Sequence, residues 1–285
     1  MPKTNFFRKW GYLLVAAILT ACMPVLEEPT PFEIITVVEV PEYPSLSYWI
    51  PSPTESFQIQ LLDYPPDLSN DADVFELDLF ETSQETINTL HESGRKVICY
   101  LNAGAWEEYR PDADDFPIDV IGKKYVGWEG ERWLDISEFE SFSSIISARF
   151  DLAVIKKCDG IDADNINGYR QNTGFSISAR DQIIYNVWLT NQAHLRELSI
   201  GMKNNGDQVV DLEEYFDFAI IEGCAIYNEC DNFLPFSNHG KTVFQVEYTD
   251  MHSSLKDFCE LALKNGYVGI LKNRGLDSWI QSCKP

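Results

Sequence analysis

Short apolar runs alternate with segments of helical pattern along most of this chain, and this alternation limits the folds available to it. The helical patterns are clearest at Ser83–Ser93 and Ser178–Glu197. Strands that alternate with helices favour a parallel sheet, and eight such units predict an α/β fold, a single (β/α)8 TIM-like barrel. We expect the eight strands at Ser56–Leu61, Val74–Leu79, Lys96–Leu101, Gly160–Ala163, Ser199–Lys203, Phe216–Ile221, Thr242–Tyr248 and Tyr267–Leu271.

The first 22 residues predict export. Basic residues precede an apolar run from Trp10 to Ile18, and Leu19-Thr20-Ala21-Cys22 resembles the lipobox of bacterial lipoproteins. We therefore expect a signal peptide over residues 1–22 and a lipid on Cys22. This lipid would anchor the protein to a bacterial membrane, at the outer membrane or the cell surface. An ordinary signal peptide or an uncleaved anchor is the alternative.

The rest of the chain divides into a tether and one domain. Residues 23–45 are rich in Pro and Glu, a composition typical of a semi-rigid tether. Residues 46–285 are enough for one barrel, which takes about 250 residues. We therefore expect one catalytic domain and a monomer.

The composition is strongly acidic. The chain has 45 Asp and Glu against 22 Lys and Arg, a formal net charge of −23. This charge repels phosphate backbones, so it disfavours nucleic acid as a partner and favours a polycation. Solubility of an exported protein is the alternative explanation. The four His residues are scattered and no spacing is typical of a zinc site, so we expect no metal or other cofactor.

Six cysteines lie beyond the signal segment, and an oxidising compartment favours disulfides between them. Cys99 and Cys158 lie in or beside apolar strands, where a free Cys behaves as a small hydrophobe, so we expect both to be unpaired. The disulfides that we expect, in order of preference, are Cys224–Cys230, which spans a short loop, and Cys259–Cys283.

Polar residues end the predicted strands in succession. Because active sites of such barrels form at the carboxyl ends of the strands, we expect these side chains to converge. Asp164 and Glu222 end apolar runs, where an ionised carboxylate costs several kcal/mol unless it is paired or used. They belong to the fourth and sixth strands, close enough across a barrel for the paired carboxylate chemistry of glycoside hydrolysis. The strand-end residues are Gln60, Asp78, Asn102, Asp164, Lys203, Glu222, Glu247 and Lys272.

A long segment without clear periodicity, Glu107–Ser137, follows the third predicted strand. It is too long for a passive loop, so we expect it to form one wall of the cleft. Aromatic side chains lie near this segment and after later strands, and their faces can stack on sugar rings; ordinary packing is the alternative for each. They are Trp106, Tyr109, Trp128, Trp133, Tyr169, Tyr227 and Tyr248.

From about Ser56 to Tyr248 a series of motifs resembles the glycoside hydrolase family 114 domain, the endo-α-1,4-polygalactosaminidases. The resemblance implies a (β/α)8 barrel that cuts α-1,4-linked galactosamine polymers, with Asp164 and Glu222 at the positions of the catalytic acids. It also gives the acidic composition a use, because partly deacetylated galactosaminan is a polycation. The motifs are KVICYLNAGAWEEYRPDADDFP (96–117), GWEGERWLDI (127–136), CDGIDADNINGY (158–169), DQIIYNVWL (181–189), FDFAIIEGCAIYNEC (216–230) and GKTVFQVEY (240–248).

Two segments depart from the family pattern. Asp162-Ala163-Asp164-Asn165 stands where the family often has Glu-Pro-Asp-Asn, and Phe57-Gln58-Ile59-Gln60 replaces a first strand that is commonly Trp-Gln-Trp-Gln. The candidate acids are kept, so the reaction type is expected to hold. A difference in substrate would arise at the sugar subsite near Phe57 and Ile59.

The two arguments together assign roles. Asp164 is expected to act as nucleophile, or as the base or stabilising carboxylate, and Glu222 as the general acid. A general acid needs a raised pKa, and we expect the apolar Ile220-Ile221 approach and repulsion from Asp164 to raise the pKa of Glu222. The residues expected to bind substrate are Asp78, Tyr100, Asn102, Asn165, Lys203, Tyr227, Glu247 and Tyr248.

Two other functions stay open. A non-catalytic cell-surface protein would hold polysaccharide in the same cleft without cutting it. A barrel hydrolase of the same class would act on a different amino-sugar polymer. Binding without shortening of the polymer would indicate the first, and product analysis over a panel of glycans would separate the second.

Overall fold

The computed structural model describes residues 48–252 and 254–283. The predicted signal segment 1–22 with Cys22 and the predicted tether 23–45 lie outside the described residues. Within the described ranges, no helix combines the length and the apolar character needed to cross a bilayer.

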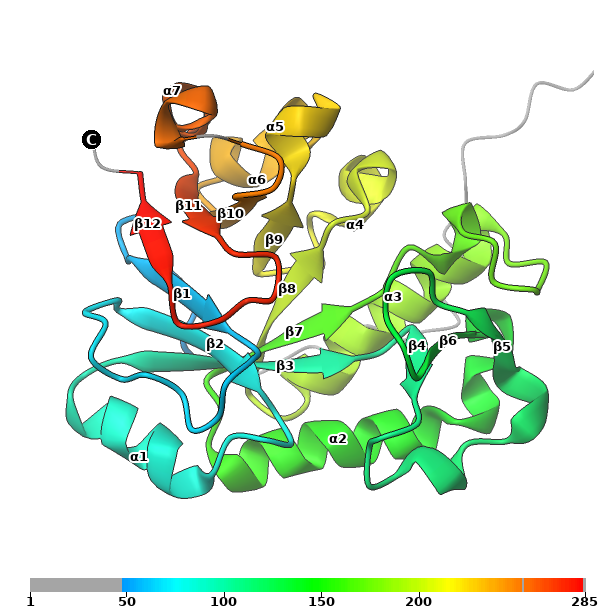
Figure 1. Cartoon of the computed structure of the whole chain (residues 1–285). Helices are drawn as coiled ribbons and strands as arrows, with labels where there is room; N and C mark the ends of the chain where they lie inside the picture. Colours follow the sequence, from blue (N-terminus) through cyan, green and yellow to red (C-terminus); the bar gives the residue numbers. More distant parts are fainter. Residues whose placement is uncertain (1–47, 253, 284–285) are drawn as a thin grey trace, which may run out of the picture. The chain divides into compact units, whose positions relative to one another are not determined.

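Eight parallel strands form the centre of the domain (Figure 1). Each strand pairs in parallel with the next in the order given below, and each overlaps one of the eight predicted strands. The predicted (β/α)8 barrel is therefore confirmed. The strands are β1 (Phe57–Gln60), β2 (Val74–Asp78), β3 (Lys96–Asn102), β7 (Gly160–Asp164), β8 (Ser199–Lys203), β9 (Phe218–Glu222), β10 (Val243–Tyr248) and β11 (Val268–Lys272).

A short strand that the sequence did not predict, β12 (Ile280–Ser282), pairs antiparallel with β11. The segment before it is tied to the first strand of the barrel: the backbone N–H of Leu61 donates to Leu276 O at 2.9 Å, and Gln58 Nε2 donates to Ser278 O at 3.0 Å. These bonds close the seam between β1 and β11. Three residues are too few for a strand pattern to be recognised in the sequence.

Helices lie on the outer side of the strands (Figure 1). The first begins and ends as predicted, because the Ser83 side chain accepts a hydrogen bond from Thr86 N and Gly94 follows with a φ of 81°. The helices are α1 (Gln84–Glu92), α2 (Ser143–Lys156), α3 (Ala179–His194), α4 (Val209–Leu212), α5 (Cys224–Tyr227), α6 (Leu234–Asn238) and α7 (Cys259–Asn265). Single 3-10 turns are η1 (Ala113–Asp115), η2 (Ile118–Val120), η3 (Ile136–Ser141), η4 (Gly168–Arg170), η5 (Gly206–Gln208), η6 (Cys230–Phe233) and η7 (Leu255–Asp257).

The insertion after β3 folds into a second, antiparallel sheet, in the order β4-β6-β5. Its strands have three or four residues each, which is too short for the alternation that would reveal them in a sequence. They are β4 (Ala105–Glu107), β5 (Ile121–Lys124) and β6 (Glu131–Leu134).

Side chains of the barrel strands alternate between its inside and its outside. Phe218 and Ile220 belong to the apolar cluster inside the barrel, whereas Ala219 and Ile221 pack in the outer core beneath the helices. Because the side-chain period of a strand is two, Glu222 follows Ile220 on the inner face. The same alternation decides which strand-end residues can reach the cleft.

Three disulfides join the six cysteines of the described ranges. The expected pairs Cys224–Cys230 and Cys259–Cys283 are both present. The prediction that Cys99 and Cys158 are unpaired is wrong, because they form a disulfide with a Cα–Cα distance of 5.9 Å. Cys99 lies in β3 and Cys158 just before β7, and only the pairing of these strands brings together residues 59 positions apart. The disulfides indicate an oxidising compartment, and hence export.

Candidate active site

A cleft of about 290 Å³ opens at the carboxyl ends of the barrel strands. Six strands contribute one inward-facing polar side chain each, and four of these, Asp78, Asp164, Lys203 and Glu222, are strand-end residues that were expected to converge. These residues are Asp78 of β2, Tyr100 of β3, Asp164 of β7, Lys203 of β8, Glu222 of β9 and Tyr248 of β10.

The chain turns sharply after three of these strands. Asn165, Asn204 and Gly223 follow the charged residues directly, and all three have a positive φ, between 50° and 67°. Asn and Gly are the residues that adopt this left-handed conformation most readily. The turns leave each charged side chain at the rim of the barrel, facing the cleft.

Lys203 lies between the two candidate catalytic acids. Its Nζ is 3.9 Å from Asp164 Oδ1 and 3.9 Å from Glu222 Oε2, and its side chain is only 2% exposed. The two carboxylate oxygens therefore cannot lie farther apart than twice that distance, which is within the range at which paired carboxylates of glycosidases cooperate. Burial opposes the charge of Lys203, but Asp162, Asp164 and Glu222 raise its pKa well above the ordinary value, so the ammonium stays charged.

Asp164 is held by hydrogen bonds from two elements. The Tyr100 hydroxyl donates to Oδ2 at 3.0 Å, and the backbone N–H of Asn165 donates to Oδ1 at 2.8 Å. Burial raises the pKa of Tyr100 well above its ordinary value, so its hydroxyl keeps the proton that it donates. Gly104 permits the approach of the β3 and β7 ends, because a Cβ there would lie 1.8 Å from Asn165 O.

Glu222 accepts hydrogen bonds from the Tyr248 hydroxyl on Oε1 and from Asn204 Nδ2, at 3.3 Å, on Oε2. Burial alone would raise the pKa of Glu222, but the Lys203 ammonium and these two hydrogen bonds bring the pKa below its ordinary value. The expectation of a raised pKa is therefore wrong for the free protein. The sequence showed the apolar approach to Glu222 but not the cation and the hydroxyl that reach it from β8 and β10.

A second carboxyl pair lies deeper in the barrel, beneath Lys203. Lys203 Nζ donates to Asp162 Oδ2 at 2.7 Å, and Glu76 of β2 lies near Asp162; both acidic residues are fully buried. Burial and the Asp162 charge raise the pKa of Glu76 well above the ordinary value, so Glu76 is the protonated member of the pair. No pattern in the sequence marks Glu76 and Asp162 as a buried pair beneath the site.

The insertion forms one wall of the cleft, which confirms the expectation for Glu107–Ser137. Arg110 makes a bidentate contact with Asp78, at 2.6 and 3.0 Å, and also binds Glu107 at 2.8 Å. Glu131, on β6, faces the same cleft and accepts a hydrogen bond from the Tyr109 hydroxyl at 2.8 Å. Arg110 and Glu131 lie within the quoted motifs but were not recognised as site residues, because Arg110 lies in the turn after β4 and β6, which carries Glu131, is too short to show a pattern.

Three of the expected substrate-binding residues, Asn102, Tyr227 and Glu247, do not line this cleft. Asn102 is fully buried, donates to Glu131 Oε2 at 3.4 Å and accepts from Asn165 Nδ2 at 3.1 Å, so it supports the floor of the site. Tyr227 is 60% exposed and lines a neighbouring hollow that also contains Glu222. Asn165 itself lines the cleft, as expected.

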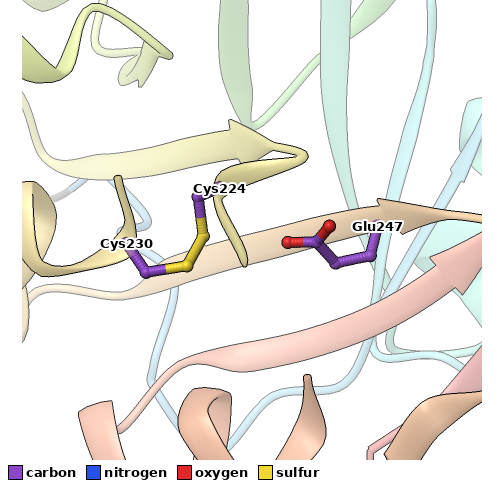
Figure 2. Close-up of side chains that lie close together, drawn as sticks. All are labelled: Cys224, Cys230 and Glu247. Atoms are coloured by element: carbon purple, nitrogen blue, oxygen red, sulfur yellow. A yellow bond between two sulfur atoms is a disulfide. The ribbon is translucent and has the colours of Figure 1, made fainter. Parts of the chain in front are cut away.

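Glu247 lies on the outside of the barrel, next to the Cys224–Cys230 disulfide (Figure 2). It is fully buried, accepts from Ala225 N at 2.9 Å and contacts His252 Nε2 at 2.7 Å. Its neighbour Tyr248 faces inward, because successive strand residues point to opposite faces. The two sulfur atoms near Glu247 are joined to each other and offer no thiolate to a metal ion.

The first and last strand-end residues, Gln60 and Lys272, form hydrogen bonds near the seam of the barrel instead of lining the cleft. Gln60 Nε2 donates to Leu62 O at 2.9 Å, and Lys272 Nζ donates to Gln58 Oε1 at 2.8 Å. Burial lowers the pKa of Lys272 to about 7. Lys272 therefore ties β11 to β1, whereas Gln60 holds the loop that follows β1.

Comparison with known families and structures gives a consistent result. The family model of glycoside-hydrolase family GH114 matches residues 41–285. Among solved structures, Ega3 from Aspergillus fumigatus, crystallised as a complex with galactosamine, is 36% identical; the match covers 85% of this chain and 100% of that chain, with a TM-score of 0.80. The search of curated proteins found no match.

Two more distant structures share the fold alone. The glycoside hydrolase domain of PelA from Pseudomonas aeruginosa is 13% identical, with a TM-score of 0.62 over 80% of this chain and 98% of that domain. A GH18 chitinase from Pseudoalteromonas aurantia is 10% identical, with a TM-score of 0.51 over 78% of this chain and 95% of that chain.

Proposed function

From the premise that this chain belongs to glycoside-hydrolase family GH114, and is therefore a glycoside hydrolase, we propose that it cuts within polysaccharides of α-1,4-linked galactosamine. The Ega3 structure contains galactosamine and is 36% identical over the whole of that chain, which supports an amino sugar as the substrate. The net charge of −23 suits a polymer whose free amino groups are cationic.

The observation that carries the proposal is the position of Asp164 and Glu222 on either side of Lys203 in one cleft. We assign Glu222 as the general acid, which gives its proton to the glycosidic oxygen as the bond to the sugar breaks. Asp164 then attacks the anomeric carbon or stabilises the positive charge on it, and water completes the hydrolysis. Lys203 lies within 3.9 Å of both carboxylates, and its ammonium favours the ionised form of Glu222 before substrate binds.

Glu222 has to take up a proton when substrate binds. Its side chain is 23% exposed in the free cleft, and the Lys203 ammonium keeps its pKa low there. A sugar bound over Glu222 would shield its exposed part from water. Such desolvation raises the pKa of a carboxyl. The cleft therefore supports an acid that becomes protonated in the complex.

The test is the release of reducing ends from partly deacetylated α-1,4-galactosaminan by residues 46–285. Glu222→Gln and Asp164→Asn are the matched variants, because each keeps the shape of the side chain and removes its charge. We expect each variant to lose at least about a hundredfold in turnover, since removal of a general acid or nucleophile costs on this order or more.

Each result leads to a different conclusion. Cleavage by the wild type alone would establish the reaction and the pair. Near-normal turnover by Glu222→Gln would refute the assignment of the acid. A folded wild type that binds the polymer without shortening it would indicate a polysaccharide-binding protein instead, and one that cuts only other glycans would indicate a different amino-sugar polymer.

We also propose that the mature protein is a monomeric lipoprotein, anchored through Cys22. The lipobox-like Leu19-Thr20-Ala21-Cys22 supports the anchor, and the disulfides support the export that it requires. Labelled fatty acid should enter the full chain but not its Cys22→Ala variant. Equal labelling of both would exclude this anchor.

A further inference from the structure

Glu131 is a nearly buried carboxyl that faces the cleft and has no cationic partner within the part of the chain that the structure describes. Its residue is only 7% exposed, yet it lines the same cleft as Asp164 and Glu222. It accepts hydrogen bonds from two neutral groups, the Tyr109 hydroxyl at 2.8 Å and Asn102 Nδ2 at 3.4 Å. Among the described residues, no Lys, Arg or His forms an ion pair with it.

The other buried or half-buried carboxylates of the cleft each have a cation. Arg110 contacts Asp78 at 2.6 Å and Glu107 at 2.8 Å, and Lys203 lies 3.9 Å from both catalytic candidates. Arg110 acts on Glu131 only over a longer range, because its guanidinium is taken up by the other two carboxylates. A buried carboxylate without a partner is costly, so the position of Glu131 needs a reason.

The local structure makes this position more costly still. Glu131 of β6 lies directly opposite Glu107 of β4, and like charges in such cross-strand pairs are destabilising. Burial, with the charges of Glu107 and Asp164, raises the pKa of Glu131 to about 7 against the opposing hydrogen bond from Tyr109. In the free protein a proton thus partly replaces the missing positive charge.

Two exposed aromatic side chains stand at the same wall. Tyr109 is 57% and Trp128 is 51% exposed, and both line the cleft with Glu131. Large exposed aromatic faces beside a buried carboxylate are suited to a ring that carries an ammonium group, because the ring can stack and the cation can pair.

We infer that Glu131 binds the ammonium group of a galactosamine unit that lies in the cleft beside the catalytic pair. This inference rests on the proposed function and names the residue that makes the site prefer a free amino sugar over a neutral or N-acetylated one. Glu131 is then a specificity-determining residue. The carboxylate pairs with the ammonium, and the Tyr109 hydroxyl keeps the carboxylate pointed into the cleft.

The test compares the binding of galactosamine and galactose by calorimetry at neutral pH, with the wild type, Glu131→Gln and Glu129→Gln. Glu129 is an exposed residue of the same insertion outside this cleft, so its variant makes the same charge change away from the site. We expect the wild type and Glu129→Gln to bind galactosamine at least about tenfold more tightly than galactose. Glu131→Gln should lose most of this preference, because it loses a charge-assisted hydrogen bond.

A preference that survives in Glu131→Gln would overturn the inference, as would a wild type that binds both sugars equally. Thermal unfolding of the variant shows whether it is folded, and its affinity for galactose should stay within about twofold of the wild type. The polymer assay separates the two proposals. If Glu131→Gln loses the preference for galactosamine but the wild type does not cut galactosaminan, the role of Glu131 is supported and the proposed function is refuted. If Glu131→Gln keeps the preference and the wild type does cut galactosaminan, the proposed function is supported and the role of Glu131 is refuted.

Discussion

At the scale of single residues, the cleft depends on a compact charge network inside the barrel. Lys203 is the cation shared by three carboxylates, at 2.7 Å from Asp162 and 3.9 Å from both Asp164 and Glu222. Glu76 adds a proton rather than a charge, because burial and the nearby Asp162 charge keep its carboxyl neutral. The Lys203 ammonium thus compensates part of the negative charge of the two carboxylates that the proposed reaction uses.

The neutral state of Glu76 predicts how stability changes with pH. Its pKa in the folded protein lies well above 4.5, the ordinary value that applies when the chain is unfolded. The folded state therefore holds a proton that the unfolded state releases above pH 4.5, so this group's contribution to stability is lost as pH rises towards the folded pKa. Glu76→Gln keeps a hydrogen-bond donor but does not titrate. We expect the free energy of unfolding of the variant, relative to wild type, to rise by up to about 1.4 kcal/mol per pH unit in this window.

Denaturant unfolding between pH 4 and pH 8 measures this difference. Glu92→Gln, at the exposed end of α1, is the control and should show no such trend. A constant difference between Glu76→Gln and wild type over the whole range would mean that Glu76 is ionised in the folded protein. The network would then carry one more negative charge than described above.

At the scale of elements, disulfides fix segments next to the strands that carry Asp164 and Glu222. Cys99–Cys158 joins β3 to the start of β7, the strand that ends in Asp164, and closes a loop of 59 positions. Cys224–Cys230 joins α5 to η6, just after Glu222, and closes a loop of only six. In the chain-entropy description a cross-link stabilises the fold more when it closes a longer loop.

This difference predicts unequal losses of stability. Replacing Cys99 and Cys158 together by Ala should lower the free energy of unfolding by about 4 kcal/mol, against about 2 kcal/mol for Cys224 and Cys230. All four residues are buried, so the cavities left by the changes are comparable and the second pair serves as control for the first. Denaturant titration of both double variants gives the comparison. Equal losses, or a larger loss for the short loop, would show that chain entropy does not dominate here.

At the scale of the whole molecule, the charge of −23 creates a field around a cleft that is itself lined by acidic residues. Such a field concentrates cations near the surface and speeds their association. Its reach depends on salt, because the Debye length falls from about 30 Å at 0.01 M to about 8 Å at 0.15 M ionic strength. The acidic composition then serves the capture of substrate in addition to solubility.

The predicted consequence is a KM that depends on salt and on acetylation together. For partly deacetylated galactosaminan, KM should rise several-fold between 0.01 M and 0.15 M ionic strength, because screening weakens the attraction of the polycation. For a short, highly N-acetylated polymer of the same linkage, KM should change little. Initial rates at several salt concentrations test this. The same salt dependence for both polymers would show that the effect is not electrostatic attraction of the substrate.

Much of the fold could be predicted because its signals are local. Each of the eight barrel strands overlaps a run of apolar residues, and Ser83 and Gly94 mark the ends of α1 by the chemistry of caps. Asp164 and Glu222 could be identified from their place at the ends of such runs. The insertion was recognised as a wall by its length alone, but β4, β5 and β6 are too short to show a period.

Tertiary structure decided what the strand-end residues meet. Glu247 and Tyr248 are neighbours in sequence, yet the two faces of β10 place the first against α5 and the second against Glu222. Cys99 finds Cys158 because β3 pairs with β7 across 59 positions.

By itself, the sequence determined the barrel, the cleft at its carboxyl end and the place of Asp164 and Glu222 in that cleft, because alternation and capping act within a few residues. Only the tertiary structure decided the ionisation of Glu222 and the lack of an ion-pair partner for Glu131 among the described residues. Both depend on charges and hydroxyls brought from other strands, and electrostatic interactions act through space rather than along the chain.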